Sequence, residues 1–198
     1  MPRTPRQASA TGFYHVLARG HDRKEIFRDA ADYRAYLATL ARFKKDFPCK
    51  LYHFCLMPNH IHLLMETAHI QLLTALMRRV QQSYQLHWRC RYDLVGNLWQ
   101  GRFKSIPIEE EPYLLECARY VERNPVRAEL CKRPEDYPWS SASFYFGDGE
   151  NPHRGMLDRS PAFLSFGQGD TAHRRYRVFV GGQRPYDRLV DAQLESLE

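Results

Sequence analysis

Hydrophobic positions along this chain recur with two periods, which predicts strands and helices in alternation. A period of two marks a short strand at 13–18 and a hairpin over 49–66 that turns at Pro58 and Asn59. Apolar residues return every three or four positions over 31–47, about 70–91 and 109–124, as on one face of a helix. Residues 98–108 indicate one or two further short strands ending at Pro107.

The order strand, helix, hairpin, helix, strand, helix predicts an α+β fold. We expect an antiparallel β-sheet of the split βαβ type, as in ferredoxin-like and RRM-like domains, with flanking α-helices. At 198 residues the chain is long enough for one main domain with a core of its own. We place a flexible basic arm at 1–12, the domain at 13–147 and a C-terminal extension at 148–198 that ends in acidic residues: Asp187, Asp191, Glu195 and Glu198.

The hairpin carries two histidines, His60 and His62, with one hydrophobe between them. Side chains alternate across a strand, so both imidazoles share one face while Ile61 and Leu63 point into the core. Two imidazoles on one face are suited to a metal ion, whereas the alternative is a pair of half-buried polar side chains. The pair alone leaves both interpretations open.

The third helix presents a tyrosine beside its apolar face. At about 100 degrees per residue, one face gathers four small or apolar side chains: Leu114, Cys117, Ala118 and Val121. Tyr120 lies about 100 degrees from the centre of that face, on the side of Glu116 and Asn124. It therefore borders the core, as a tyrosine with a buried ring and a wet hydroxyl does.

The charge of the chain favours an acidic partner such as nucleic acid. The formal net charge is +6 and the isoelectric point is near 9.1. Three stretches lack acidic residues and contain arginines, over 67–92, 97–108 and 171–186. Single strands of DNA bind where bases stack on aromatic rings and basic side chains contact phosphates. Candidate contacts are Arg78, Arg79, Trp99, Arg102, Phe103 and Lys104, although either aromatic ring can instead belong to the core.

The cysteines and the chain's hydropathy favour the cytoplasm. Five cysteines without Cys-x-x-Cys spacing support neither a disulfide framework nor a zinc ribbon, so we expect reduced thiols. The N-terminal residues lack the apolar core of a signal peptide, and no stretch is apolar enough to span a bilayer.

Four ordered motifs closely resemble REP-associated tyrosine transposases, the single-tyrosine branch of the HUH endonuclease superfamily. They are MPNHIHLL at 57–64, LWQGRFKS at 98–105, ARYVERNPVRA at 118–128 and DYPWSS at 136–141, with a weaker echo in RRYRVFV at 174–180. The resemblance implies an HUH-type catalytic domain that nicks and rejoins single-stranded DNA at hairpin-forming repeats. It places the metal ligands at His60, His62 and Asn124, and the nucleophile at Tyr120.

The implied chemistry agrees with the residue types. A tyrosine hydroxyl with its ordinary pKa of about 10 is a weak nucleophile, so attack on a phosphodiester needs a metal ion nearby. A set of nitrogen and oxygen ligands suits Mg²⁺ or Mn²⁺. Asn124 precedes Pro125, which should place it at or just past the helix end, and Glu116 is the alternative third ligand.

Several points stay open at the level of sequence. Arg19, at the start of a polar loop, resembles a family motif that contacts bases beside a hairpin. The resemblance favours a monomer, with a dimer as the alternative. It also implies a bacterial protein of the cytoplasm that associates with the nucleoid. Two other functions are compatible with the same residues: a metal phosphodiesterase in which water attacks, and a hairpin-binding module without catalysis.

Overall fold

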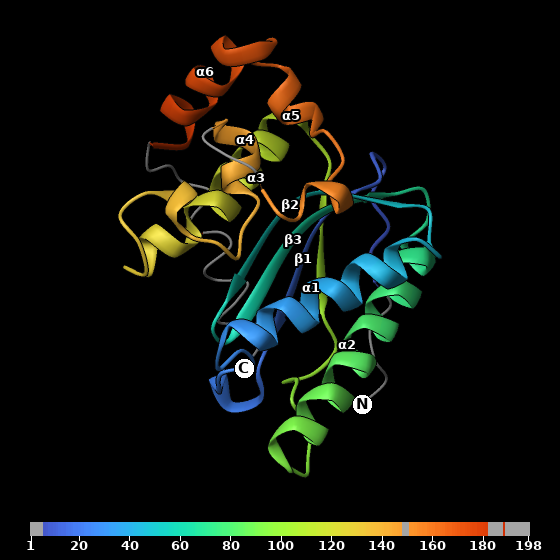
Figure 1. The fold of residues 1–198 in the computed structure, drawn as a ribbon. Coiled ribbons are helices and arrows are strands. Elements are labelled where there is room, and N and C mark those ends of the chain that lie inside the picture. The colour runs from blue at the N-terminus through green and yellow to red at the C-terminus, as the bar shows by residue number, and fades with distance from the viewer. Residues whose placement is uncertain (1–5, 148–150, 182–187, 189–198) are drawn as a thin grey trace.

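A four-stranded antiparallel sheet forms the centre of the molecule (Figure 1). The computed structural model describes residues 6–147, 151–181 and 188. The strands are β1 (Phe13–Arg19), β2 (Cys49–Met57), β3 (His60–Thr67) and β4 (Lys104–Ile108), in the order β2-β3-β1-β4. All three neighbouring pairs are antiparallel. The expected α+β fold with an antiparallel sheet is therefore confirmed.

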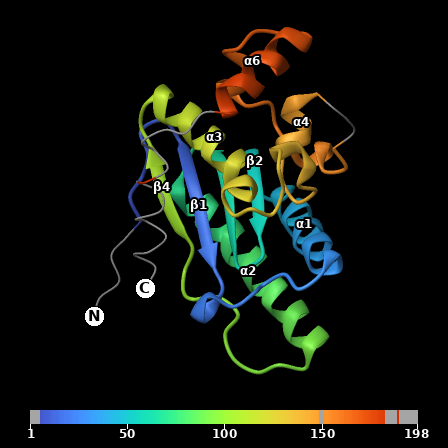
Figure 2. The ribbon, with the colours of Figure 1, turned by 90° about the vertical axis from the view of Figure 1, so that its left-hand side faces the viewer.

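Helices cover both faces of this sheet (Figures 1 and 2). Helices α1 (Ala30–Lys44) and α2 (Ile70–Tyr92) cover one face, and α3 (Glu111–Arg127) crosses the other. The apolar stripe of α2 packs into the first core layer as the periodicity indicates, with Leu73, Leu76, Met77, Val80, Tyr84 and Trp88 all buried. Helix α3 starts where the acidic run meets Pro112, a residue suited to the first turn of a helix.

The hairpin of β2 and β3 turns at Pro58 and Asn59, as its sequence predicts. Alternation along β3 sends Leu63 to the layer under α1 and α2, and Leu64 to the layer under α3. A bulge between Leu51 and His53 shifts the register of β2, so that His53 also faces α3. Both faces of the sheet are thus buried, and the α3 side contains the histidines.

Beyond α3 the chain forms a smaller helical layer. It comprises α4 (Ala142–Phe146), α5 (Pro161–Leu164) and α6 (Gly169–Gly181), with short 3₁₀ turns η1 (His21–Arg23), η2 (Pro134–Asp136) and η3 (Arg154–Met156) elsewhere in the chain. Tyr176 and Val180 of α6 share one apolar cluster with Tyr145 and Phe146 of α4. The expected boundary at 147 therefore divides residues that pack together. The acidic end at 187, 191, 195 and 198 lies outside the described residues.

The described part of the N-terminal segment is fixed to the sheet edge. Thr11 Oγ1 donates a hydrogen bond to the carbonyl oxygen of Ile108, and the amide of Ser9 donates to the hydroxyl of Tyr14 at 2.8 Å. Arg6 stacks over the ring of Phe103 at 3.9 Å. Residues 6–12 thus contact this edge through hydrogen bonds and an aromatic ring, and the flexibility of the arm stays a prediction.

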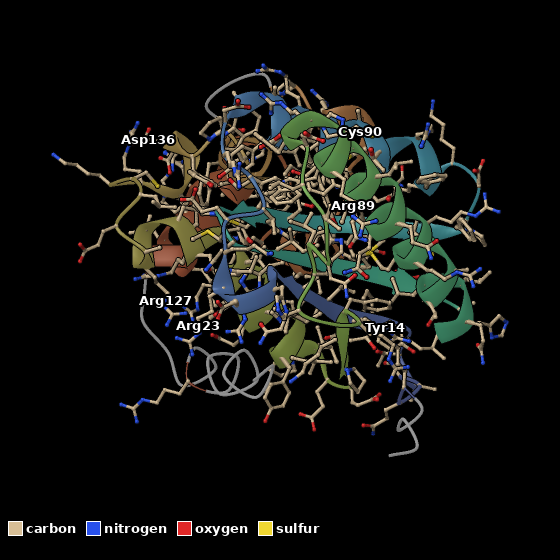
Figure 3. The ribbon with its side chains drawn as sticks, turned by 90° about the horizontal axis from the view of Figure 1, so that it is seen from below. Tyr14, Arg23, Arg89, Cys90, Arg127 and Asp136 are labelled. Carbon is tan, nitrogen blue, oxygen red and sulfur yellow. The ribbon has the colours of Figure 1, made fainter. Side chains whose placement is uncertain are left out.

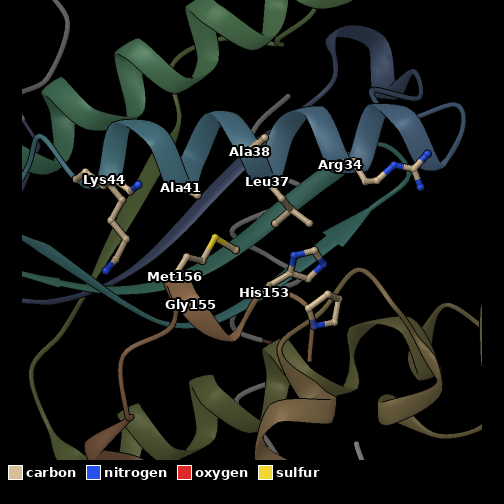
Figure 4. A pocket seen from close by; sticks show the side chains of 10 residues that line it. Arg34, Leu37, Ala38, Ala41, Lys44, His153, Gly155 and Met156 are labelled. Carbon is tan, nitrogen blue, oxygen red and sulfur yellow. The ribbon is translucent and has the colours of Figure 1, made fainter. Parts of the chain in front are cut away.

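A groove of about 480 Å³ separates α1 from the η3 turn (Figure 4). Its walls are Leu37 and Ala41 on α1, and His153 and Met156 on the extension. None of the residues predicted for the site lines it. All five cysteines are free thiols, and no described helix is long and apolar enough to cross a membrane.

The core assignment leads to a stability test on α2. Leu76 is fully buried, whereas Leu86 on the same helix is 64% exposed. We expect Leu76→Ala to lower the free energy of unfolding by about 2–5 kcal/mol, through lost burial and a residual cavity. Leu86→Ala should change it by less than about 0.5 kcal/mol. Urea denaturation of both variants measures the difference, and equal losses would contradict this packing.

Candidate active site

Cross-strand pairing gathers the predicted histidines on the face under α3. His60 lies opposite Arg19 of β1, and His62 lies opposite Leu17, which in turn lies opposite Lys104 of β4. Residues directly opposite one another in a sheet share a face. The imidazole ring centroids of His60 and His62 are 4.9 Å apart with planes at 85°. The structure therefore brings the two histidines together as the strand alternation predicts.

Each of these imidazoles is held through its Nδ1 atom. Nδ1 of His60 lies 2.6 Å from Oδ1 of Asn59, and Nδ1 of His62 lies 3.1 Å from Nε2 of His15. The side-chain nitrogen of Asn59 donates to the carbonyl oxygen of Arg23 at 3.1 Å, which fixes its Oδ1 toward His60. Because Oδ1 of Asn59 can only accept a hydrogen bond, Nδ1 of His60 must carry the proton of the neutral imidazole. The free lone pair of His60 is therefore on Nε2.

The Nε2 atoms are buried and make no hydrogen bond of standard geometry within the described residues, although the Asn124 side chain lies against His60. Neither Nε2 of His60 nor Nε2 of His62 has a partner within the described part of the chain. Leaving a buried nitrogen unpaired is costly, so such an atom calls for an explanation, such as a catalytic role, a bound water or an ion. The unpaired Nε2 atoms, each with Nδ1 occupied, form the arrangement that metal-binding histidines adopt.

Burial keeps all three histidines neutral at pH 7. Burial lowers the pKa of His15 to about 3. It lowers the pKa of His60 to about 4, with contact from Asn124 opposing the shift and the charge of Arg19 adding to it. Burial, followed by the neighbouring His60, His15 and Arg127, lowers the pKa of His62 well below its usual value. Neutral imidazoles are the form that binds metal ions.

Tyr120 packs directly against this histidine group. Its ring centroid lies 5.4 Å from that of His62 and 6.0 Å from that of His15, and the Arg127 guanidinium lies over the ring at 5.0 Å. The residue is only 1% exposed, so it lies inside the core rather than at its border. A helical wheel describes α3 alone, and the wall that covers this side of the helix belongs to β1 and β3.

Asn124 occupies the next turn of the same helix. We expected Pro125 to end the helix at Asn124, but α3 continues to Arg127 with Pro125 inside it. The proline removes one hydrogen-bond donor, while the amide of Ala128 still donates to the Asn124 carbonyl oxygen at 3.0 Å. Asn124 is 6% exposed, contacts His60, and has an unpaired Nδ2 among the described residues.

Glu116, the alternative ligand, is engaged elsewhere. Its Oε2 accepts a hydrogen bond from Nε of the buried Arg119 at 2.9 Å. Within the described residues, no three His, Cys, Asp or Glu side chains are placed together to hold a metal ion. A site on His60 and His62 would therefore be completed by an amide such as Asn124 or by water. The residues present fit a divalent metal with mixed nitrogen and oxygen ligands.

His15 is the residue that sequence reasoning missed. It lies in β1, 47 positions before His62, in a strand whose alternation would have placed it on the same face as Leu17 and Arg19. That signal shows only that the three side chains share one face. It does not show which residue of another strand lies opposite, because register depends on the pairing of β1 with β3.

The predicted nucleic-acid contacts separate into different environments. Arg19 is 8% exposed beside His60, and its Nε donates to Oε1 of Gln100 at 2.8 Å. Arg79 faces the rings of Phe43 and Phe47 at 6.0 and 5.9 Å, away from Arg78. Figure 3 shows Arg23 and Arg127 on one side of the molecule, and the Arg23 carbonyl oxygen accepts a hydrogen bond from Asn59 of the hairpin turn.

The two predicted stacking aromatics belong to the core. Trp99 is 7% and Phe103 is 4% exposed, and both pack in the layer under α1 and α2. Trp99 Nε1 donates to the carbonyl oxygen of Gln81 at 3.1 Å, which satisfies its only polar group. Of the two interpretations that the sequence left open for these rings, the structure thus favours the core, and their contact with DNA stays a prediction.

Comparisons with known proteins show which family and which solved structures this chain resembles. The family model of IS200-like transposases matches residues 9–124, more than half of the chain. A REP-associated tyrosine transposase bound to a REP hairpin shares the fold, with a TM-score of 0.64 and 17% identity over 81% of this chain and 99% of that one. A Deinococcus radiodurans structure described as a transposase candidate gives a TM-score of 0.43 and 15% identity, over 62% of this chain and 97% of that one. No curated protein shows a significant match.

The family match, which includes the histidine pair and Tyr120, defines the class of this protein as a DNA transposase. The chain belongs to the IS200-like transposase family. Its fold is the one found in a REP-associated tyrosine transposase, which agrees with the motif resemblance.

The hydrogen bond from His60 to Asn59 can be tested separately from the ligands. We expect Asn59→Ala to weaken Mn²⁺ binding about 10–100-fold, because the His60 imidazole loses the acceptor that fixes its Nδ1 proton. Asn59→Asp keeps an acceptor and should bind Mn²⁺ at least as tightly as the unmodified protein. Titration followed by electron paramagnetic resonance measures both. If both variants bind Mn²⁺ equally weakly, the loss of affinity would come from a changed hairpin turn rather than from the lost acceptor of His60.

Proposed function

We propose that this transposase nicks and rejoins single-stranded DNA beside hairpin-forming repeats, with Tyr120 as the nucleophile. The observation that supports this most directly is the contact of Tyr120 with His62, whose ring centroids are 5.4 Å apart, on the face where both histidine Nε2 atoms lack a hydrogen bond to any described residue. A nucleophile beside a candidate metal site is the arrangement that phosphoryl transfer requires.

The reaction is a transesterification. The hydroxyl oxygen of Tyr120 attacks phosphorus in line and loses its proton, and the bond from phosphorus to the 3′-oxygen breaks. The leaving 3′-oxygen takes up a proton, so the products are a 5′-phosphotyrosine and a free 3′-hydroxyl. Because the ester bond is conserved in the adduct, a 3′-hydroxyl can attack it and rejoin the strand without ATP.

His60, His62 and Asn124 would hold the divalent ion, Mg²⁺ or Mn²⁺. When bound there, the ion supplies Lewis-acid stabilisation of the charge that develops on the phosphate oxygens. The chain contributes the orientation of the ligands: Asn59 fixes His60, and His15 fixes His62. Burial of Tyr120 restricts water near its hydroxyl, which favours attack by the phenol over hydrolysis.

Basic residues around the histidines support a phosphate-containing substrate. Arg19 lies beside His60, and Lys104 shares the same face of the sheet through Leu17. Burial and the charge of Arg19 lower the pKa of Lys104, which indicates that the two cations lie near one another. Clustered like charges raise the local potential and attract a polyanion.

The partner we propose is single-stranded DNA carrying a REP-type hairpin, as in the similar structure. Tyr120 and the histidines of one chain already meet, which supports catalysis in a monomer. On this proposal residues 13–147 supply the chemistry and the extension from 148 supports α3, since α6 packs beside α3. The family's activity further suggests a nucleoid-associated protein in the bacterial cytoplasm.

The nucleophile is tested by substitution. On labelled hairpin oligonucleotides from the repeats that flank its gene, with Mn²⁺, we expect a covalent adduct on denaturing gels. Tyr120→Phe should abolish it, because the ring remains and only the attacking hydroxyl is lost. Tyr113→Phe, on the same helix but 49% exposed, is the matched control and should retain the adduct.

Other outcomes would replace this function. Cleavage that survives Tyr120→Phe would show that water attacks, as in a metal phosphodiesterase. Tight hairpin binding without cleavage on any tested repeat would make the protein a binding module.

The ligand set is tested independently of DNA. We expect His60→Ala and His62→Ala each to weaken Mn²⁺ binding more than tenfold. Removing only the hydrogen-bond partner of a metal ligand already weakens binding by about 10-fold or more, and these variants remove the ligand itself. His69→Ala, an exposed histidine after the same strand, should bind Mn²⁺ normally. Isothermal titration calorimetry provides the measurement, and unchanged affinity in either site variant would refute this assignment.

A further inference from the structure

A second groove lies on the opposite side of the sheet from Tyr120, between α2 and the segment 97–103. It has a volume of about 420 Å³, within the range of pockets that take small ligands. Its polar lining combines amides and arginines with one threonine: Arg6, Thr74, Arg78, Gln81, Gln82, Gln85, Asn97 and Arg102. The described residues that line it include no acidic side chain. We call it the α2 groove.

Gln81 is the feature that points to a ligand. It is only 8% exposed, it lines the groove, and its Nε2 has no hydrogen-bond partner within the described structure. A buried amide donor without an acceptor costs stability, so its retention needs a reason. Its backbone carbonyl holds the ring of Trp99, which keeps the opposite wall in place.

The wall of the groove is connected to the active site. The amide of Gln100 donates to the Arg19 carbonyl oxygen at 2.9 Å, and Oε1 of Gln100 accepts from Nε of Arg19 at 2.8 Å. Arg19 in turn lies opposite His60. One short segment therefore contacts the candidate metal site through Gln100 and lines the groove through Trp99, Gly101 and Phe103. Arg102 of this segment lines the groove, and Lys104, two residues later, lies on the histidine face; both are suited to phosphates.

Amides and arginines in this combination are the side chains that read nucleobases and phosphates. A glutamine amide donates to acceptor atoms on a base edge, while arginine contacts phosphate or guanine. A paired base has its Watson–Crick edge occupied, whereas an unpaired base can enter a pocket with that edge free. The absence of acidic side chains from the described walls favours an anionic nucleotide over a cation or a basic peptide.

We propose that the α2 groove binds one unpaired nucleotide of the DNA strand, with Gln81 Nε2 donating to its base and Arg78 contacting its phosphate. This inference rests on the proposed function, since the strand that enters the groove is the single-stranded flank of the same hairpin substrate. The groove fixes which nucleotide lies at the active site, because the segment 97–103 joins the two. It thus acts as a register site for cleavage.

The test is a double-mutant cycle between protein and DNA. The probe is a fluorescein-labelled hairpin oligonucleotide with a short single-stranded flank, in which abasic sites replace the flanking nucleotides one at a time. Binding is measured by anisotropy in EDTA, so that no cleavage occurs. For the unmodified protein we expect one abasic position to weaken binding about tenfold, the scale of a lost hydrogen bond that leaves its buried donor unpaired.

Gln81→Met removes the donor and keeps the side-chain volume. In this variant the same abasic position should cost less than about twofold, because the base no longer has its partner. Gln71→Met, at an exposed position of α2 outside the groove, is the matched control and should show the full tenfold loss. If every abasic position costs the same in Gln81→Met as in the control, the proposal is overturned.

Two further measurements separate the possible failures. Arg78 is exposed, so Arg78→Ala should leave the unfolding temperature unchanged. If its guanidinium contacts a phosphate, the variant should reduce by about one the magnitude of the slope of the logarithm of the DNA-binding constant against the logarithm of the salt concentration. An unchanged slope would overturn the phosphate contact even if Gln81→Met folds poorly. Formation of the Tyr120 adduct is measured separately. If the adduct forms but Gln81→Met leaves the cost of every abasic position unchanged, only the groove proposal is refuted. If Gln81→Met changes that cost but no adduct forms, only the proposed chemistry is refuted.

Discussion

The antiparallel pairing of β1 with β3 is the constraint on which the rest of this structure depends. It places Arg19 opposite His60 and Leu17 opposite His62, and it brings His15 within 3.1 Å of the His62 imidazole. A shift of the register by one residue would turn every side chain of one strand to the other face. The histidines would then enter the apolar layer under α1 and α2, and Tyr120 would face hydrophobes.

Helix α3 is fixed over this face by a buried polar network. Glu122 accepts a hydrogen bond from Ser141 Oγ at 2.7 Å and lies 2.7 Å from Nδ1 of His53, while Tyr145 stacks on the His53 ring at 4.1 Å. All of these groups are inaccessible to solvent, so their geometry is strongly determined. The network links the sheet, the tyrosine helix and α4, and it explains why the extension and the domain share their packing.

Much of the fold was predictable because its signals are local. The hairpin at Pro58 and Asn59, the strand carrying His60 and His62, and the apolar stripe of α2 all follow from periodicity and turn residues. The errors arose where tertiary contacts outweigh local preference. Helix α3 continues through Pro125 because its packing on the sheet outweighs one lost hydrogen bond. Trp99 and Phe103 lie in the core, which the sequence had left open beside a role in stacking.

The sequence by itself determined the family, the antiparallel sheet and the shared face of His60 and His62, since motif spacing and strand alternation are properties of adjacent residues. Only the tertiary structure decided that His15 supports His62, that Asn124 rather than Glu116 lies against His60, and that Gln81 Nε2 is buried with no partner among the described residues. Each of these depends on which residues of distant segments meet. That choice is made by strand register and helix packing, which no single segment encodes.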